Sequence, residues 1–343
     1  MRAMTSTAAV ARVRSIIYGP WVAASLHTVA ELRIADLLAR EPRSAAELAA
    51  AAGVRPDPLR RVLRVLVAHG VFAERADGRF EQNELSDLLR EDVNGSLRPS
   101  VLLHGSGARW VLWPQMLHTL RTGETAFSKV HGVEVFDYLA RHEEDARLFN
   151  GVMSQGSALL AAEIVAGYDF GQFRTIVDVG GGHGLLLSRL LEAIPMARGV
   201  LFDLPEVIEG ARAALAARGL ADRCALVGGS FFDAVPSGGD GYIMKWILHD
   251  WDDAACHTIL RNIRSVIPPD GRVVVVDRLT PERVTDDASL RVNLLMDLNM
   301  LVTHTGRERT EKEFRRLFEQ TGFALASVRT TATAHGIFEG VPA

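Results

Sequence analysis

The stretch DVGGGHG, at residues 178–184, decides the fold of this chain. It follows a strand-like run at residues 174–177 and precedes a helical pattern of leucines that begins at Leu185. A glycine-rich turn between a strand and a helix is typical of α/β folds that bind nucleotides, because glycine lets the backbone approach the ligand closely. A dinucleotide-binding turn would have a third glycine where Leu185 stands. The pattern therefore indicates an S-adenosylmethionine site rather than a dinucleotide site.

Three further strand-like runs each end in residues that suit a ligand. These residues are Asp203 after 199–202; Ser230, Phe231 and Phe232 after 224–227; and Lys245 and His249 after 241–244. Asp203 stands about 20 residues beyond the glycine turn, the spacing at which an acidic side chain meets ribose hydroxyls. A hydroxyl followed by aromatic rings suits a purine. Because open parallel sheets bind ligands at the carboxyl ends of their strands, we expect one site there.

Six motifs stand in a fixed order along the chain. They are DVGGGHG, LFDLPEV (201–207), GGSFFDAVP (228–236), MKWILHDWDD (244–253), GRVVVVD (271–277) and GRERTEKEF (306–314). In these motifs the chain resembles the small-molecule O-methyltransferases of the plant caffeic-acid and isoflavone type and their bacterial relatives in antibiotic pathways. The resemblance implies a Rossmann-like class I methyltransferase sheet with an N-terminal helical winged-helix dimerisation domain. It also implies methylation of a hydroxyl on an aromatic or polyketide-like secondary metabolite.

The resemblance implies roles for individual residues as well. His249 is expected to be the general base, flanked by Asp277 and Glu308. The expected cofactor-binding residues are Asp178, Gly180, Gly182, Asp203, Leu204, Ser230, Phe231, Phe232 and Lys245. The expected substrate residues are Phe149, Met153, Asp250, Asn293 and Met296. Ser230 departs from the family, which usually has Asp there, so we expect a weaker hold on the cofactor through the loss of a charge-assisted hydrogen bond.

The chemistry of methyl transfer sets what the site must do. The cofactor carries an activated methyl group, so the protein must hold a nucleophile in line with it and remove a proton. Orientation can supply roughly 7 to 11 kcal/mol of the barrier, whereas a general base typically adds about 10²- to 10⁴-fold. His249 can take a phenol proton when a carboxylate fixes its tautomer, and Asp277 or Glu308 can be that carboxylate. The acidic run at Asp250, Asp252 and Asp253 is typical of a helix start, and no metal is expected.

The N-terminal region reads as a winged-helix module. Its signals are a capping box at Ser44 and Glu47, a helix end near Gly53, Pro58 in the first turn of a second helix, a stop at Gly70 and a hairpin turn at Asp77-Gly78. Winged helices often bind DNA, and Arg60, Arg61 and Arg64 line the second helix. We favour a solvated polar face for these arginines, because the chain is acidic and carries acidic residues nearby.

Two hypotheses compete with methyl transfer. Some proteins that resemble this sequence decarboxylate or hydroxylate aromatic substrates and use the bound cofactor without transferring its methyl group. The presence of His249, Asp277 and Glu308 favours methylation. The other hypothesis is a winged-helix regulator with a metabolite-sensing domain. A nitrogen acceptor in place of oxygen also stays open.

Length and composition bound the remaining possibilities. The chain has 343 residues, of which 48% are hydrophobic, and a net charge of −4, which argues against a nucleic-acid partner. We expect three parts: a dimerisation domain at 1–100, a helical linker and substrate-pocket segment at 101–166, and a catalytic domain at 167–343. Cys224 and Cys256 are too few for a disulfide framework, which favours a cytoplasmic protein.

The apolar stretch at residues 16–26 deserves a separate interpretation. It faintly resembles a signal peptide after Arg12 and Arg14, but Gly19-Pro20 is expected to break it. No apolar run reaches the roughly 18 residues that span a membrane, so no membrane partner is expected. An exposed helix with Ile16, Ile17, Trp21 and Leu26 would be a large apolar patch, which predicts an interlocking element of a homodimer.

Overall fold

The computed structural model describes residues 6–287 and 290–343. Contacts divide the chain into two compact units, one formed by Met1–Val111 with His142–Gln155 and the other by Leu112–Arg141 with Gly156–Ala343. The long helix α11 (Glu143–Gly167) supplies residues to both units. The boundaries expected at residues 100 and 166 remain predictions.

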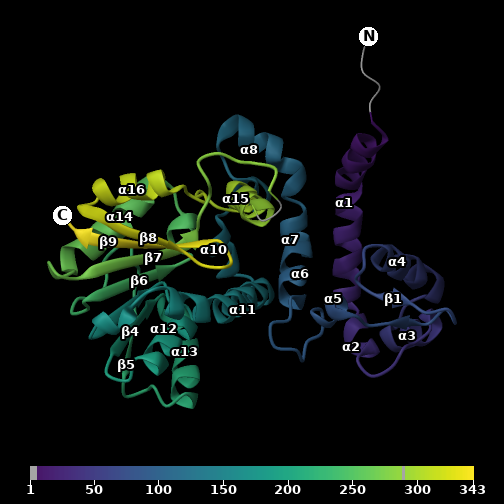
Figure 1. The fold of residues 1–343 in the computed structure, drawn as a ribbon, viewed down its shortest axis with the longest axis horizontal. Coiled ribbons are helices and arrows are strands. Elements are labelled where there is room, and N and C mark those ends of the chain that lie inside the picture. Colours follow the sequence, from purple (N-terminus) through teal and green to yellow (C-terminus); the bar gives the residue numbers. More distant parts are fainter. Residues whose placement is uncertain (1–5, 288–289) are drawn as a thin grey trace, which may run out of the picture. The chain divides into compact units, whose positions relative to one another are not determined.

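The first unit is helical with one small hairpin (Figure 1). Apart from the start of α11, its elements are α1 (Thr7–Glu31), α2 (Ile34–Leu38), α3 (Ala45–Ala52), α4 (Pro56–Ala68), β1 (Ala73–Glu74), β2 (Phe80–Glu81), α5 (Glu84–Asp87), α6 (Arg98–Gly105) and α7 (Gly107–Trp110). The capping box is confirmed, because Ser44 Oγ accepts from the backbone N–H of Glu47 and the Glu47 carboxylate accepts from that of Ser44. The hairpin is also confirmed, with Gly78 at φ +78° in its turn.

The expected break at Gly19-Pro20 is wrong. Helix α1 runs through Pro20 without interruption. Proline removes one backbone donor from a helix, and its ring crowds the carbonyl four residues earlier. The side chains around it lie at the surface of this unit, with Ile16 71% exposed and Trp21 67% exposed, so solvent can reach the carbonyl that proline leaves unpaired. The helix ends instead before Arg33, whose φ of 54° separates α1 from α2.

The second unit contains a twisted seven-stranded sheet with helices on both faces (Figure 1). Its strands are β3 (Thr175–Val179), β4 (Arg198–Asp203), β5 (Cys224–Gly228), β6 (Gly241–Lys245), β7 (Arg272–Arg278), β8 (Phe323–Thr330) and β9 (His335–Pro342). The order is β5-β4-β3-β6-β7-β9-β8, and β9 alone runs antiparallel to both of its neighbours. The Rossmann-like sheet expected from the glycine turn is confirmed.

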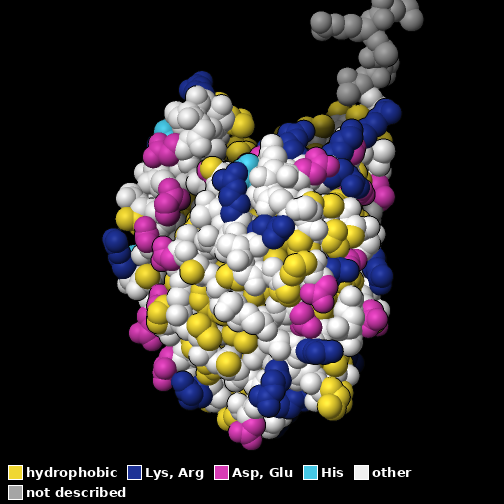
Figure 2. Space-filling model, turned by 90° about the vertical axis from the view of Figure 1, so that its left-hand side faces the viewer, with side chains coloured by type: hydrophobic (Ala, Val, Ile, Leu, Met, Phe, Trp, Pro, Cys, Tyr) yellow, Lys and Arg dark blue, Asp and Glu magenta, His cyan; other side chains and the backbone are white. Residues whose placement is uncertain are grey.

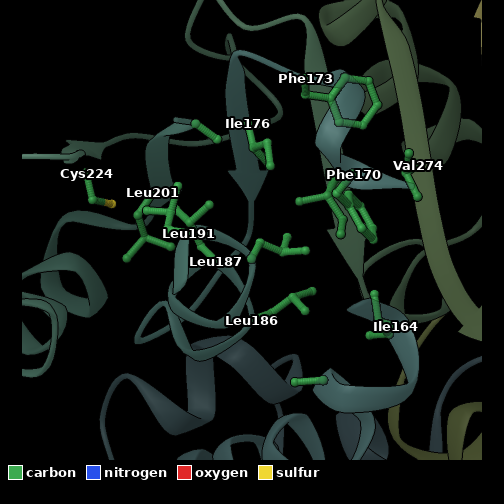
Figure 3. Packing of buried hydrophobic residues seen from close by; sticks show 14 of the residues in the cluster. Ile164, Phe170, Phe173, Ile176, Leu186, Leu187, Leu191, Leu201, Cys224 and Val274 are labelled. Carbon is green, nitrogen blue, oxygen red and sulfur yellow. The ribbon is translucent and has the colours of Figure 1, made fainter. Parts of the chain in front are cut away.

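Two apolar clusters cover the two faces of this sheet. One cluster packs the end of α11 together with α12 (Leu185–Ala193) and α13 (Pro205–Ala217) against strand residues such as Ile176 and Leu201 (Figure 3). The other packs α14 (Asp253–Val266) and α16 (Glu311–Glu319) against the alternate residues, such as Val177 and Phe202. This alternation follows from the two-residue period of a strand.

Short helices make up the rest of the second unit. They are η1 (Trp113–Gln115), α8 (Met116–Thr122), α9 (Ala126–His131), α10 (Val135–Leu139), η2 (Phe170–Gln172), η3 (Leu248–Asp250) and α15 (Arg291–Thr303). The helical character expected for 101–166 is therefore confirmed. Two of its helices, α8 and α9, end at Gly123 and Gly132, which adopt left-handed conformations.

Neither cysteine forms a disulfide, and both are buried in the described structure. Within the described ranges, no helix is long and apolar enough to cross a membrane. Figure 2 shows basic and acidic side chains interspersed over most of the face that it presents.

Candidate active site

The elements expected to bind the ligand lie where the strand order of the sheet reverses. Strands β3 and β6 are neighbours, but β4 and β5 extend the sheet on one side while β7 extends it on the other. Such a switch point leaves a crevice at the carboxyl ends of the two central strands. DVGGGHG begins with the last two residues of β3, and the segment 246–251 follows β6, so both lie at this edge.

The glycine turn packs against the segment that follows β6. Gly180 and Gly182 have φ values of +69° and +59°, which residues other than glycine rarely adopt. A Cβ on Gly180 would overlap the side chain of Ile247. The turn therefore needs glycine both for its backbone conformation and for close approach, as expected of a turn that cradles a ligand.

Asp203 lies at the end of β4 and faces the same turn. Its Oδ2 accepts from the backbone N–H of Gly182 at 2.7 Å, and its Oδ1 accepts from that of Leu204 at 2.7 Å. Each carboxylate oxygen can accept a second hydrogen bond. Two neighbouring acceptors at a strand end fit the paired hydroxyls of a ribose. Burial raises the pKa of Asp203, while its two backbone hydrogen bonds favour the ionised form.

The residues expected around the adenine form an aromatic loop after β5. Ser230 Oγ accepts from the backbone N–H of Phe232 at 3.2 Å, which fixes the turn. The Phe231 and Phe232 rings lie 4.8 Å apart, and the Trp251 ring packs edge-on against Phe232 at 4.7 Å. Asn262 Nδ2 donates to the carbonyls of both phenylalanines. The loop thus has aromatic faces held by side-chain hydrogen bonds.

Two buried groups of opposite charge, Asp178 and Lys245, lie on the neighbouring strands β3 and β6. Burial raises the pKa of Asp178 to about 7 and lowers that of Lys245 to about 8, although each charge favours ionisation of the other. Asp178 Oδ2 has no hydrogen-bond partner among the described residues. Trp246, the next residue, has a φ of 57°, and the Lys245 ammonium lies 3.8 Å from the centre of its ring. Strain in a bulky residue beside buried charges is typical of a functional site.

His249 is held by Glu308. Its Nδ1 lies 3.1 Å from Glu308 Oε1, and its Nε2 lies 3.6 Å from Asp250 Oδ1. An ionised carboxylate only accepts, so the Nδ1–H donates to Glu308. A neutral imidazole in this tautomer carries its lone pair on Nε2. Of the two carboxylates expected to fix the tautomer, the structure selects Glu308.

Three carboxylates surround this imidazole. Burial by itself lowers the pKa of His249, but Asp250, Glu308 and Asp277 outweigh it and raise the pKa to about 9. Asp277 is fully buried, and burial raises its pKa to about 7. Within the part of the chain that the structure describes, neither carboxylate oxygen of Asp277 accepts a hydrogen bond. Asp277 therefore acts on His249 through charge, and Glu308 through a direct hydrogen bond.

Two residues close to Glu308 in the sequence hold the backbone of the His249 turn, and neither was predicted to be functional. Arg309 is buried and donates from Nη1 to the Leu248 carbonyl at 2.6 Å and from Nη2 to the Trp251 carbonyl at 2.8 Å. Gly306 packs directly on the same turn, and a Cβ there would overlap backbone atoms of residues 249–251. Their place in the motif GRERTEKEF, beside Glu308, was the available signal.

The residues expected to bind substrate are divided between the two units. Asp250 lies beside His249, and Met296 is half-buried on α15. Asn293 on α15 is buried, and its amide already bonds Arg278 and the carbonyls of Leu279 and Ala334. Phe149 and Met153 lie on the part of α11 that belongs to the first unit. The substrate roles of these residues remain predictions.

The acidic run after His249 begins a helix, as expected. Asp252 caps α14 and accepts from the backbone N–H of Ala255 at 2.8 Å. Asp253 pairs with Arg309 at 2.9 Å and with Arg307 at 2.9 Å. Among the described residues, no cluster of three His, Cys, Asp or Glu side chains could hold a metal ion.

Comparison with known proteins supports these assignments of fold and ligand. A model of the O-methyltransferase domain matches residues 113–324, and a model of the O-methyltransferase dimerisation domain matches residues 15–92. The chain is 42% identical over 95% of its length to a phenazine O-methyltransferase of Lysobacter antibioticus, covering 94% of that protein. It is 39% identical over 91% of its length to a mitomycin biosynthesis 6-O-methyltransferase of Streptomyces lavendulae, covering 88% of that protein.

A solved structure carries the same fold with ligands. It is the O-methyltransferase of neocarzinostatin biosynthesis in complex with S-adenosylmethionine and 2-hydroxy-5-methyl naphthoic acid. The TM-score is 0.80 at 31% identity, over 94% of this chain and 96% of that one. Glycine turn, acidic strand end and aromatic loop thus occur together in a chain that matches the family model over more than half its length. The protein belongs to the S-adenosylmethionine-dependent O-methyltransferases.

Proposed function

We propose that this enzyme methylates a hydroxyl of an aromatic or polyketide-like secondary metabolite, with His249 as the general base. The hydrogen bond between His249 Nδ1 and Glu308 Oε1 is the observation that carries the proposal. It leaves Nε2 as the basic atom at the carboxyl edge of the sheet, beside the turn expected to hold the cofactor. One relative named above is a phenazine O-methyltransferase and another is a 6-O-methyltransferase of mitomycin biosynthesis, which supports an aromatic secondary metabolite as the acceptor.

Different residues of the site would bind the cofactor and remove the proton. When bound, S-adenosylmethionine supplies a methyl group activated by its sulfonium. Gly180 and Gly182 would admit it, Asp203 would hold its ribose, and the Phe231 loop would flank its adenine. His249 Nε2 takes the proton from the acceptor hydroxyl, and Glu308 stabilises the resulting imidazolium.

The high pKa of His249 adds a condition to this mechanism. At a pKa of about 9 the imidazole of the ligand-free protein is mostly protonated at neutral pH and is no base. A cation bound nearby lowers the pKa of an imidazole. His249 is therefore expected to become a competent base only when the cofactor is in place, which ties proton removal to the loaded enzyme.

Mass spectrometry of products tests the proposal. The protein is incubated with methyl-deuterated S-adenosylmethionine and a panel of phenazines, naphthoates, flavonoids, phenolic acids and aromatic amines. A labelled methyl ether supports the proposal, and a labelled amine would change the acceptor to nitrogen. Loss of carbon dioxide or gain of oxygen without label would favour the alternative chemistry, which none of the relatives named above supports.

The functional enzyme is a homodimer joined through its N-terminal domain. The match to a dimerisation domain and the exposure of Ile16, Ile17 and Trp21 support this. Trp21→Glu should lower the molar mass measured by light scattering from two chains to one. We also propose that the enzyme has no nucleic-acid partner, because Arg60 and Arg64 both lie within ion-pair distance of Glu74. The two free cysteines support a cytoplasmic location as a further part of the proposal.

A further inference from the structure

Arg278, the last residue of β7, lies beside the catalytic pair, although the mechanism above does not use it. Its Nε lies 3.9 Å from Glu308 Oε1, the same oxygen that lies 3.1 Å from His249 Nδ1. The Glu308 side chain is fully buried, and that of Arg278 is 19% exposed. One carboxylate oxygen therefore lies between an imidazole and a guanidinium.

Asn293 fixes the place of this guanidinium. Arg278 Nη1 donates to Asn293 Oδ1 at 2.8 Å. Asn293 Nδ2 donates to the carbonyls of Leu279 at 3.4 Å and Ala334 at 3.2 Å. Two carbonyl acceptors accept only from the –NH₂ end of the amide, so the amide oxygen has to face Arg278. Asn293 is 3% exposed, and this buried network holds Arg278 toward Glu308.

We propose that Arg278 is a positioning residue for the reaction, which orients Glu308 and offsets part of its charge so that His249 can work as a base. Asn293 acts one step further out by anchoring Arg278. The proposal rests on the role of His249 proposed above. It gives the buried Asn293 a function within the protein instead of the contact with substrate expected from the sequence.

The charges around the site explain why such a cation is needed. The carboxylates that act on His249 are Asp250 on η3, Asp277 on β7 and Glu308 before α16, and His335 on β9 faces both His249 and Arg278. Further ionisable groups act on or contact these carboxylates: Lys245 on β6, Asp297 on α15, His304 and Arg309. His335 is neutral near pH 7, because burial and then the positive charge of Arg278 lower its pKa to about 3. Arg278 places a positive charge within 4 Å of the Glu308 oxygen that His249 contacts.

Loss of the positive charge of Arg278 should change the pKa of His249 in one direction. The negative charge of Glu308 then acts on His249 without compensation and stabilises the imidazolium. The pKa of His249 should rise further, so that a smaller fraction is free base at any pH below it. Because Arg278 acts on His249 through Glu308, we expect the pKa of His249 to rise by about 0.5 to 1.

Histidine NMR on the full-length, ligand-free protein tests this without a known acceptor. The protein is labelled at histidine ¹³Cε1, the His249 signal is assigned with His249→Asn, and its titration is followed in wild type and variants. Arg278→Gln should raise the midpoint, and Arg278→Lys, which keeps the charge, should leave it near the wild-type value. Asn293→Ala should raise it by a smaller amount, because the guanidinium loses its anchor but stays in place.

A matched control separates this effect from general damage to β7. Arg272 lies on the same strand and pairs with Glu339 at 3.3 Å, away from the His249 cluster, so Arg272→Gln should not move the midpoint. Unchanged binding of S-adenosylhomocysteine by calorimetry confirms that each variant is folded. If Arg278→Gln is too unstable to titrate, Asn293→Ala decides the question alone. The proposal is overturned if the His249 midpoint does not move in a folded Arg278→Gln. When Asn293→Ala decides alone, an unmoved midpoint in that variant overturns it. A shift in Arg278→Lys as large as that in Arg278→Gln also overturns it.

Because the NMR readout needs no methyl acceptor, it also separates this proposal from the proposed function. A shifted His249 midpoint in an enzyme whose product has lost carbon dioxide or gained oxygen without label would retain the charge relation and reject the role in methylation. A methylated product with an unmoved His249 midpoint would support methylation and reject the positioning role of Arg278.

Discussion

Ion pairs of the N-terminal hairpin module and ion pairs at the carboxyl edge of the sheet differ in burial. In the module, formed by α3, α4, β1 and β2, Arg64 lies 3.6 Å from Glu74 and is 63% exposed. At the sheet edge, His249 lies 3.1 Å from a Glu308 that is fully buried. An exposed pair contributes about 0 to 1 kcal/mol to stability, whereas burial of a charge carries a penalty that only good partners offset.

The difference in burial indicates that the charges kept for function lie at the carboxyl edge of the sheet. Asp178, Asp277 and Glu308 each bury at least one carboxylate oxygen that has no hydrogen-bond partner in the described ranges. Such atoms destabilise a fold unless a ligand or a specific electrostatic role accounts for them. In the module, one such buried atom is Arg43 Nε, just before α3, whereas the sheet edge gathers three carboxylates of this kind. The difference therefore lies in the concentration of buried carboxylates at one edge of the sheet.

The largest expected effect is the loss of the base. His249→Ala should lower kcat by about 10²- to 10⁴-fold, because proton removal loses its catalyst while orientation remains. Binding of S-adenosylhomocysteine, measured by calorimetry, should survive. His257→Ala is the matched control, since His257 lies on α14 and contacts Gln320 at the surface. Wild-type kcat in His249→Ala would contradict base catalysis and leave positioning as the whole mechanism.

The next effect comes from the backbone under the base. Gly306→Ala should lower kcat by about 10- to 100-fold, because a Cβ there displaces the His249 turn and small misplacements of a catalytic group are expensive. Overpacking should also lower the free energy of unfolding by about 1 to 3 kcal/mol. Gly107→Ala is the control, because open space surrounds that position. Equal kcat in the two variants would show that the turn tolerates movement.

Local signals in the sequence predicted the module better than the sheet edge. The capping box at Ser44 and Glu47 and the turn at Asp77-Gly78 involve neighbours a few residues apart, and both are present. Pro20 was misjudged because one missing hydrogen bond does not end a long helix.

At the sheet edge, the sequence predicted convergence but not partners. Parallel strands bring their carboxyl ends together, so His249 and Asp203 could be assigned to one edge. The choice of Glu308 over Asp277 depends on a contact across 59 residues of chain, which no periodicity reports. Arg309 and Gly306 act on backbone atoms rather than on a ligand, and Arg278 acts through Glu308, so residue type alone did not identify them.

A smaller effect concerns the pKa of His249. The His249 NMR signal of the ligand-free protein should titrate near pH 9, since Asp250, Glu308 and Asp277 raise its pKa above the ordinary value. Glu308→Gln removes one of these charges and should lower the midpoint by about one unit. The shift is opposite in sign to that expected for Arg278→Gln. A rise in Glu308→Gln would mean that another group controls the imidazole.

The smallest expected effect lies in the module. Arg64→Gln should change the free energy of unfolding by less than about 0.5 kcal/mol in denaturant titration, because the pair with Glu74 is exposed and screened by salt. Its kcat and its affinity for S-adenosylhomocysteine should equal those of wild type. Arg309→Gln is the contrasting variant, because it removes a buried guanidinium that donates to the carbonyls of both Leu248 and Trp251. If Arg64→Gln destabilised the protein as much as Arg309→Gln, exposure would not separate structural from functional charge in this molecule.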